Sequence, residues 1–312
     1  MSAEPERPSR PRPADGPERG ATRTREQVVP DICAWYAAHA RDLPWRERGV
    51  SAWGVMVSEF MLQQTPVSRV LPRWREWMER WPTPADLSVE PVGEAVRAWG
   101  HLGYPRRAQR LWQAAAEIAG RFGNVVPDDL EDLRSLPGVG EYTAAAIASF
   151  AYGRRHVVLD TNVRRVLARL DGGVAQPPAT VTRAERDRAR SWLPDDDADA
   201  ALWAVAAMEL GAQVCVATTP DCGRCPVRSD CAWARAGYPA WTGPARRGQA
   251  YAGTDRQCRG ALLAVLRESD APRHEADLLA AWPVDAAQAD RALASLLADG
   301  LVRREDAGLL SL

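Results

Sequence analysis

Glu59 is the first residue whose surroundings favour chemistry. It lies in the helical stretch 55–64, where its neighbours three and four positions away are apolar with one exception. Loss of hydration on such a face raises the pKa of a carboxyl and lets it hold a proton near neutral pH. Glu59 is therefore a candidate general acid. The alternative is a structural glutamate at the edge of a buried helix.

Asp160 is the second candidate, because an amphipathic helix pattern begins directly after it in the segment 159–166. A carboxyl at a helix start accepts hydrogen bonds from free backbone amides, and these amides favour its charged form. Such a group could stay anionic and stabilise a positive transition state. The plain interpretation is an N-cap, and the two interpretations are compatible.

Four cysteines form the most specific pattern in the chain. Cys215, Cys222, Cys225 and Cys231 have the spacing C-x6-C-x2-C-x5-C, so four thiolates fall within one short loop. This spacing favours an iron–sulfur cluster, while four-cysteine zinc sites more often use two separated pairs. Zinc and disulfides remain the alternatives, and the expected reducing compartment disfavours disulfides.

A glycine-containing turn separates two helical patterns at Leu136, Pro137, Gly138, Val139 and Gly140. Two glycines permit a tight turn with positive φ, and the following helix then presents free amides at its first turn. Such amides can bind a DNA phosphate. The alternative is an ordinary helix–helix turn.

Composition sets wider limits. The 312 residues are 46% hydrophobic, enough for one or two substantial cores, and the formal net charge is −1. The sequence contains no lysine, so every basic side chain other than histidine is arginine. We find no run that could span a bilayer and no export signal, so we expect a cytoplasmic protein, and we expect it to be a monomer. Because the net charge is close to zero, any contact with DNA must come from a local surface.

The chain divides into four parts. Residues 1–26 are rich in Pro and Arg and are expected to be a disordered tail, and 27–236 are predicted to be an all-α core with one short strand-like run at 156–159. Residues 237–254 are typical of a linker. Residues 255–312 predict three helices and a hairpin, like a small winged-helix module. Its net charge of −3 favours packing or a protein partner as much as DNA.

Taken in order, these motifs resemble the helix-hairpin-helix DNA glycosylases related to endonuclease III and MutY, over about residues 28–236. The resemblance implies two helical lobes, one a barrel over about 53–159 and the other an iron–sulfur lobe formed by 27–52 and 160–236. It places the active site in the cleft between them. It also implies a structural [4Fe–4S] cluster that positions a basic loop on double-stranded DNA.

The same resemblance assigns catalytic roles. Glu59 would protonate a flipped adenine and Asp160 would stabilise the sugar cation, with Tyr142 and Asn162 orienting the site. Tyr142 stands where lyase relatives have a lysine. Because the chain contains no lysine, a lysine Schiff base is excluded. Tyr142 as a packed aromatic residue is the alternative.

Binding residues are implied by position as well. The adenine pocket would be lined by Arg41, Leu43, Trp45, Arg46 and Val67. DNA would be contacted by Gln63, Gln64 and Tyr104 beside the mispair, and by the hairpin residues Leu136, Pro137, Gly138, Val139 and Gly140 together with Thr143. A polar helix end and a buried aromatic are the alternatives for Gln63–Gln64 and for Tyr104.

The chain also departs from the family pattern. Pro105 replaces a usual tyrosine, and Ala204 and Val205 replace a usual polar pair of the base pocket. The last 58 residues do not resemble the MutT-like domain that commonly follows. The expected substrate is adenine opposite 8-oxoguanine or guanine. The alternatives are a thymine or uracil glycosylase acting opposite guanine, and a non-catalytic iron–sulfur DNA-binding regulator.

Overall fold

The structure is a computed structural model that describes residues 23–244 and 251–312, and it is mainly helical. The α-helices are α1 (Arg25–His39), α2 (Ala52–Leu62), α3 (Val67–Arg80), α4 (Pro84–Ser88), α5 (Val92–Trp99), α6 (Arg106–Arg121), α7 (Leu130–Ser135), α8 (Glu141–Tyr152), α9 (Thr161–Leu170), α10 (Arg183–Ser191), α11 (Asp197–Gln213), α12 (Ala232–Arg235), α13 (Asp255–Arg267), α14 (Glu275–Ala280) and α15 (Ala286–Ala298). No helix among them is both long and apolar enough to cross a membrane. The predicted tail up to residue 22 and residues 245–250 of the predicted linker lie outside the described residues.

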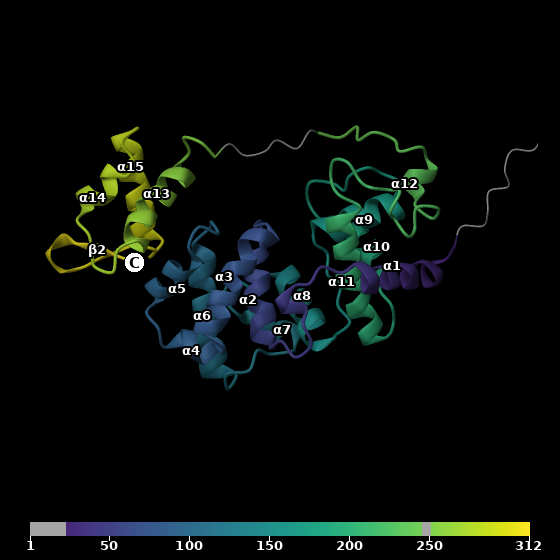
Figure 1. The fold of residues 1–312 in the computed structure, drawn as a ribbon, viewed down its shortest axis with the longest axis horizontal. Helices are drawn as coiled ribbons and strands as arrows, with labels where there is room; N and C mark the ends of the chain where they lie inside the picture. The colour runs from purple at the N-terminus through teal and green to yellow at the C-terminus, as the bar shows by residue number, and fades with distance from the viewer. Residues whose placement is uncertain (1–22, 245–250) are drawn as a thin grey trace, which may run out of the picture.

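Helices α2 to α8 form one lobe, in the middle of Figure 1. Its core is rich in tryptophan. Trp77 packs edge-to-face against Trp81 and Trp99, with ring centroids 4.7 and 5.8 Å apart. Each buried indole removes a large apolar surface from water, so this cluster stabilises the lobe that carries Glu59.

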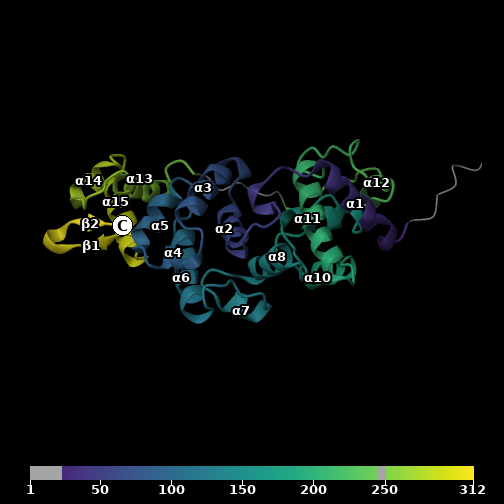
Figure 2. The ribbon, with the colours of Figure 1, turned by 60° about the horizontal axis from the view of Figure 1, so that its bottom comes forward.

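A second lobe consists of α1 and α9 to α12, which lie together in both ribbon views (Figures 1 and 2). It has a separate core that joins Val28 and Ile32 of α1 to Trp203 and Leu210 of α11. Helix α1 therefore belongs to this lobe, α2 to α8 form the barrel, and α9 to α12 complete the second lobe. These two cores confirm the predicted two-lobed, all-α fold.

One local expectation differs from the structure. Leu43 and Trp45, expected in the iron–sulfur lobe, pack in the barrel core instead. The cause is the short 3-10 helix η1 (Pro44–Arg46), which brings the Trp45 ring to 5.8 Å from that of Trp74. The strand-like run 156–159 is extended but belongs to no strand ladder in the described chain.

The C-terminal module holds α13, α14 and α15, followed by strands β1 (Arg303–Arg304) and β2 (Leu310–Ser311), with the 3-10 helix η2 (Asp306–Gly308) between the strands. The two strands pair antiparallel, and an isolated bridge links Arg273 to Leu310. The order of elements is the one the sequence predicts.

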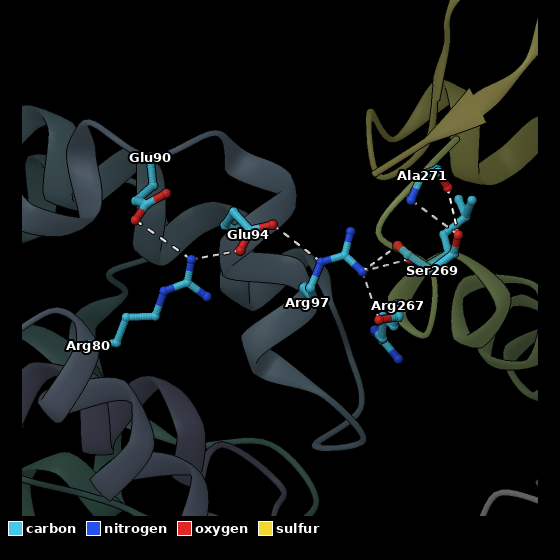
Figure 3. A network of polar contacts seen from close by, with 8 residues as sticks. Arg80, Glu90, Glu94, Arg97, Arg267, Ser269 and Ala271 are labelled. Atoms are coloured by element: carbon cyan, nitrogen blue, oxygen red, sulfur yellow. Dashed lines mark hydrogen bonds and ion pairs between the residues drawn. The ribbon is translucent and has the colours of Figure 1, made fainter. Parts of the chain in front are cut away.

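The module is seated on α5 and α6 of the barrel and shares its hydrophobic core. Arg97 of α5 donates to the carbonyls of Leu266, Arg267 and Ser269 at 2.7–2.9 Å (Figure 3). These carbonyls end α13, where the helix dipole favours a cation. Glu94 accepts from Arg97 and Arg80 and so holds the network together (Figure 3).

Candidate active site

One cavity of about 920 Å³ lies between the lobes and gathers most of the predicted site. Helix α2 supplies its barrel wall, and α9 and α11 supply the opposite wall. Its lining includes the predicted catalytic residues Glu59, Tyr142, Asp160 and Asn162, the predicted pocket residues Arg41, Leu43, Trp45, Arg46 and Val67, and Gln63 and Gln64. Its volume is in the range typical of small-molecule binding sites.

Glu59 lies in the middle of α2 and only 6% of it is exposed. Burial, with a smaller contribution from the charge of Asp160, raises the pKa of its carboxyl to about 7. A hydrogen bond with Tyr142 and the charge of Arg46 act in the opposite direction. Glu59 can therefore carry a proton at neutral pH, as its position in the sequence predicts.

Asp160 is the N-cap of α9. Its Oδ1 accepts from the backbone N–H of Val163 at 2.6 Å, and its Oδ2 accepts from Asn162 Nδ2 at 2.7 Å. The expectation that helix amides would favour the charged form overall needs correction. These bonds do lower the pKa of Asp160, but burial outweighs them and raises it. Both oxygens still accept hydrogen bonds, the arrangement that suits a carboxylate.

Tyr142 and Asn162 connect the two acids to their surroundings. Tyr142 is hydrogen-bonded to Glu59, and burial raises the pKa of its phenol well above the usual value, which keeps the hydroxyl protonated. The Asn162 side chain accepts from Arg165 Nη2 at 2.7 Å through its Oδ1, which fixes the amide so that its Nδ2 faces Asp160. Arg165 also donates to the carbonyls of Gly211 and Cys215.

Glu209 is a residue of the site that the sequence analysis missed. It is fully buried in α11 and binds Arg41 through Nε at 2.6 Å and Nη2 at 2.7 Å, and Arg46 through Nη2 at 3.0 Å. The two arginines hold the pKa of Glu209 at about 2, against the opposing effect of burial. An acidic residue among the apolar residues of α11 could have indicated a buried, functional carboxylate. Its partners are too distant in sequence to be paired by pattern.

Substitution Glu209→Gln should destabilise the protein, because two arginines lose their buried counter-charge. A folded-state pKa below the usual value contributes stability above about pH 4.5 and loses it as the pH falls towards 2. We expect a loss of about 3 kcal/mol at pH 7 in urea unfolding, shrinking as the pH falls below 4. The exposed Glu131→Gln is the control and should change stability by less than about 0.5 kcal/mol. Equal losses at pH 7 and pH 3 would contradict this assignment.

The hairpin presents its backbone rather than its apolar side chains. Leu136 and Val139 are buried in the barrel core, and Thr143 is buried and accepts from Gln63 Nε2 at 3.5 Å. These three side chains point into the protein, so DNA contacts at their positions would come from the backbone. Gly138 and Gly140 are exposed. The free amides at the start of α8 remain the phosphate site the sequence predicts.

Substitution Gly138→Ala should damage the hairpin. Gly138 has φ +82°, and an added Cβ would lie 2.7 Å from Arg110 Cβ and 2.9 Å from Phe60 Cε1. We expect a loss of about 1–3 kcal/mol in thermal unfolding, with weaker duplex binding. Gly140→Ala is the matched control, since φ is −94° there and nothing lies within 4 Å of its added Cβ. Similar losses in both variants would refute the steric explanation.

The cysteine loop follows α11. The six cysteines of the chain form no disulfide, and Cys215, Cys225 and Cys231 pack against the second core. Burial, with smaller contributions from the other three loop cysteines, raises the pKa of the Cys225 thiol to about 12, so the four sulfurs lie close enough to interact electrostatically. The described residues contain no group of three or more His, Cys, Asp or Glu side chains placed to hold a single metal ion.

Arg169 completes the surroundings of the loop. Its buried guanidinium donates to Cys215 Sγ at 3.3 Å and to the carbonyl of Val216 at 2.8 Å, and it stacks on the Trp233 ring. A cation beside one sulfur would offset the negative charge of thiolate ligands. This donor set fits a cluster held by thiolates.

Comparisons with known proteins agree with this architecture. Residues 57–191 match the HhH-GPD superfamily of base excision DNA repair proteins. The adenine DNA glycosylase of Mycobacterium tuberculosis (strain ATCC 25618 / H37Rv) is 53% identical over 296 residues, covering 95% of this chain and 97% of that protein. The human adenine DNA glycosylase is 41% identical over 208 residues, covering 64% of this chain and 38% of that protein.

Solved structures support the fold. A thermostable thymine-DNA glycosylase aligns with a TM-score of 0.60 and 24% identity, covering 68% of this chain and 97% of that one. An endonuclease III bound to DNA aligns with a TM-score of 0.57 and 21% identity, covering 69% and 98%. These likenesses show the fold. The 53% identity over 95% of the chain, together with the family match, shows that the chain belongs to the adenine DNA glycosylases of the HhH-GPD superfamily.

Proposed function

We propose that this protein hydrolyses the N-glycosidic bond of adenine mispaired with 8-oxoguanine or guanine in DNA. The observation that carries the proposal is the pair of acids in one cavity, Glu59 with a pKa of about 7 and Asp160 with both oxygens hydrogen-bonded. Glu59 donates its proton to the adenine ring, which makes the base a better leaving group. The N-glycosidic bond then breaks, and Asp160 stabilises the sugar cation that is left. Water adds to this cation and loses a proton, which returns Glu59 to its protonated form.

Polar recognition of the base would come from the wall that carries Arg46. Its Nη1 is buried and has no hydrogen-bond partner within the described parts of the chain, while Nη2 is held by Glu209. A ring nitrogen of adenine could accept from Nη1. Val205, on the opposite wall, offers only an apolar surface.

The proposed enzyme removes the base without cutting the strand. Tyr142 lies against Glu59 in the position where lyase relatives have a lysine, and a phenol cannot form an imine. Because the sequence has no lysine, the expected product is an intact abasic strand that breaks only in hot alkali.

Cys215, Cys222, Cys225 and Cys231 would hold a [4Fe–4S] cluster, whose contribution would be structural: it would hold the loop with Arg224 and Arg228 against DNA. Protein purified in air should be brown and contain about four irons per chain. Stoichiometric zinc without colour would refute the cluster.

The function is tested with duplexes that contain A·8-oxoG, A·G, T·G or U·G, each developed with hot alkali after incubation. Adenine release from the first two is the expected result. Release of thymine or uracil but not adenine would overturn the proposal. No release from any duplex would favour the regulator.

A further inference from the structure

Two loop residues near the cavity have strained backbones. Gln64, which lines the cavity, has φ 55°, and Tyr104, which is 42% exposed, has φ 50°. A side chain other than glycine in this region costs about 1–3 kcal/mol and persists only where surrounding contacts enforce it. Both side chains are exposed to solvent. The contacts that enforce their backbone conformation must therefore come from the protein interior beneath each loop.

Arg107 supplies these contacts for both loops. Its guanidinium donates at 2.6–3.4 Å to the first loop at the carbonyls of Phe60, Met61 and Gln63 and at Thr65 Oγ1, and to the second loop at the carbonyls of Leu102 and Gly103. The oxygens at the end of α2 carry the negative end of its dipole, which favours a cation there. Burial lowers the pKa of Arg107 to about 10, so it stays charged at neutral pH.

The same arginine begins a stack that reaches the C-terminal module. Arg107 lies over the rings of Trp99 and Tyr104, at 5.2 and 5.5 Å from their centroids. Arg256 of α13 lies over the rings of Tyr104 and Tyr251, at 5.7 and 5.2 Å, and donates to the Tyr104 hydroxyl at 2.8 Å. Tyr104 therefore contacts one guanidinium from the barrel and one from the module.

We propose that Arg107 and Arg256 are positioning residues that hold Gln64 and Tyr104 as one rigid unit for insertion into DNA, and that the C-terminal module thereby takes part in mispair recognition. The proposal rests on the proposed glycosylase function. A loop that is already fixed in its inserted conformation loses less conformational entropy when its side chain enters the base stack. The stacking of that side chain then offsets part of the free energy needed to extrude the base. The acidic module thus contributes through one arginine that it directs at the insertion loop.

The test uses the full chain and an A·8-oxoG duplex with 2-aminopurine next to the adenine, whose fluorescence rises when the base unstacks. Arg256→Gln should lower the fluorescence at saturating protein and reduce the preference for this duplex over a fully paired one by about two- to fivefold, the size of one exposed cation–π and hydrogen-bond contact. Its melting temperature should stay within about 1 °C of the wild type. Arg304→Gln removes an equal charge from the same module, where Arg304 pairs with Glu275, and should behave as the wild type.

Arg107→Lys supplies the second arm, because lysine keeps the charge but cannot bridge both loops. We expect losses of fluorescence and of selectivity at least as large as those of Arg256→Gln. The fold reduction in kcat should also exceed the fold reduction in affinity for fully paired DNA. If Arg107→Lys does not fold, Arg256→Gln decides alone. Wild-type fluorescence and selectivity in Arg256→Gln would overturn the proposal, whereas a wild type that releases no adenine would instead remove the proposed function.

Discussion

Substitution Glu59→Gln should reduce single-turnover adenine release by about 10²–10⁴-fold while leaving duplex binding intact. The amide keeps the size of the side chain, but its N–H groups are far too weakly acidic to transfer a proton to the leaving base. Single-turnover assays and gel-shift binding of the A·8-oxoG duplex measure the two properties separately. Unchanged release would exclude Glu59 as the acid, and loss of binding would point to a structural role.

The pH profile gives an independent check on the same residue. With a pKa of about 7, Glu59 is mostly protonated below pH 7, so adenine release should fall as the pH rises through 7. The stability of the folded protein should depend on pH in the same direction. A raised carboxyl pKa gives stability that is present below about pH 4.5 and lost as the pH rises through 7, by up to about 3 kcal/mol. Glu59→Gln should therefore melt above the wild type at pH 8.

Asp160 allows its charge to be separated from its structural role. Asn is as good an N-cap as Asp, so Asp160→Asn should retain the bond to the Val163 amide. Its own NH2 group would face Asn162 Nδ2, so the acceptor for that amide is lost and stability should fall by about 1 kcal/mol. The variant should also reduce adenine release by about 10²-fold or more, because the sugar cation loses its counter-charge.

Asp160→Ala is the matched variant, since it removes both the charge and the cap. It should show the same loss of release and a further loss of about 1 kcal/mol in urea unfolding. If Asp160→Asn releases adenine at the wild-type rate, the residue is only a cap and the two-acid mechanism fails.

Local pattern was sufficient wherever a residue's role depends on its own helix. Glu59 is buried because its helix neighbours are apolar, and Asp160 caps α9 because the amphipathic pattern starts just after it. The hairpin ends at Gly140 and α8 begins at Glu141, as the glycine spacing predicts. Family resemblance added the residues of the pocket wall, and the cavity contains them.

Pattern failed where the outcome depends on distant packing. Arg41 and Glu209 are paired across 168 positions, and no periodicity connects them. The direction of the Asp160 pKa depends on how the lobes close over it, so the amide contribution alone gave the wrong sign. Arg107 joins loops whose neighbourhood exists only in the folded barrel.

The N-terminal helix has a consequence for synthesis on the ribosome. Helix α1 packs against α11 and belongs to the second core, yet the whole barrel is translated between them. The barrel is continuous in the chain and can fold as it emerges, whereas α1 must keep its apolar stripe unpartnered until α11 leaves the exit tunnel. A chain stalled before Asp197 would therefore display a folded barrel preceded by a helix with an exposed apolar face. Chaperones bind exposed apolar surfaces of this kind.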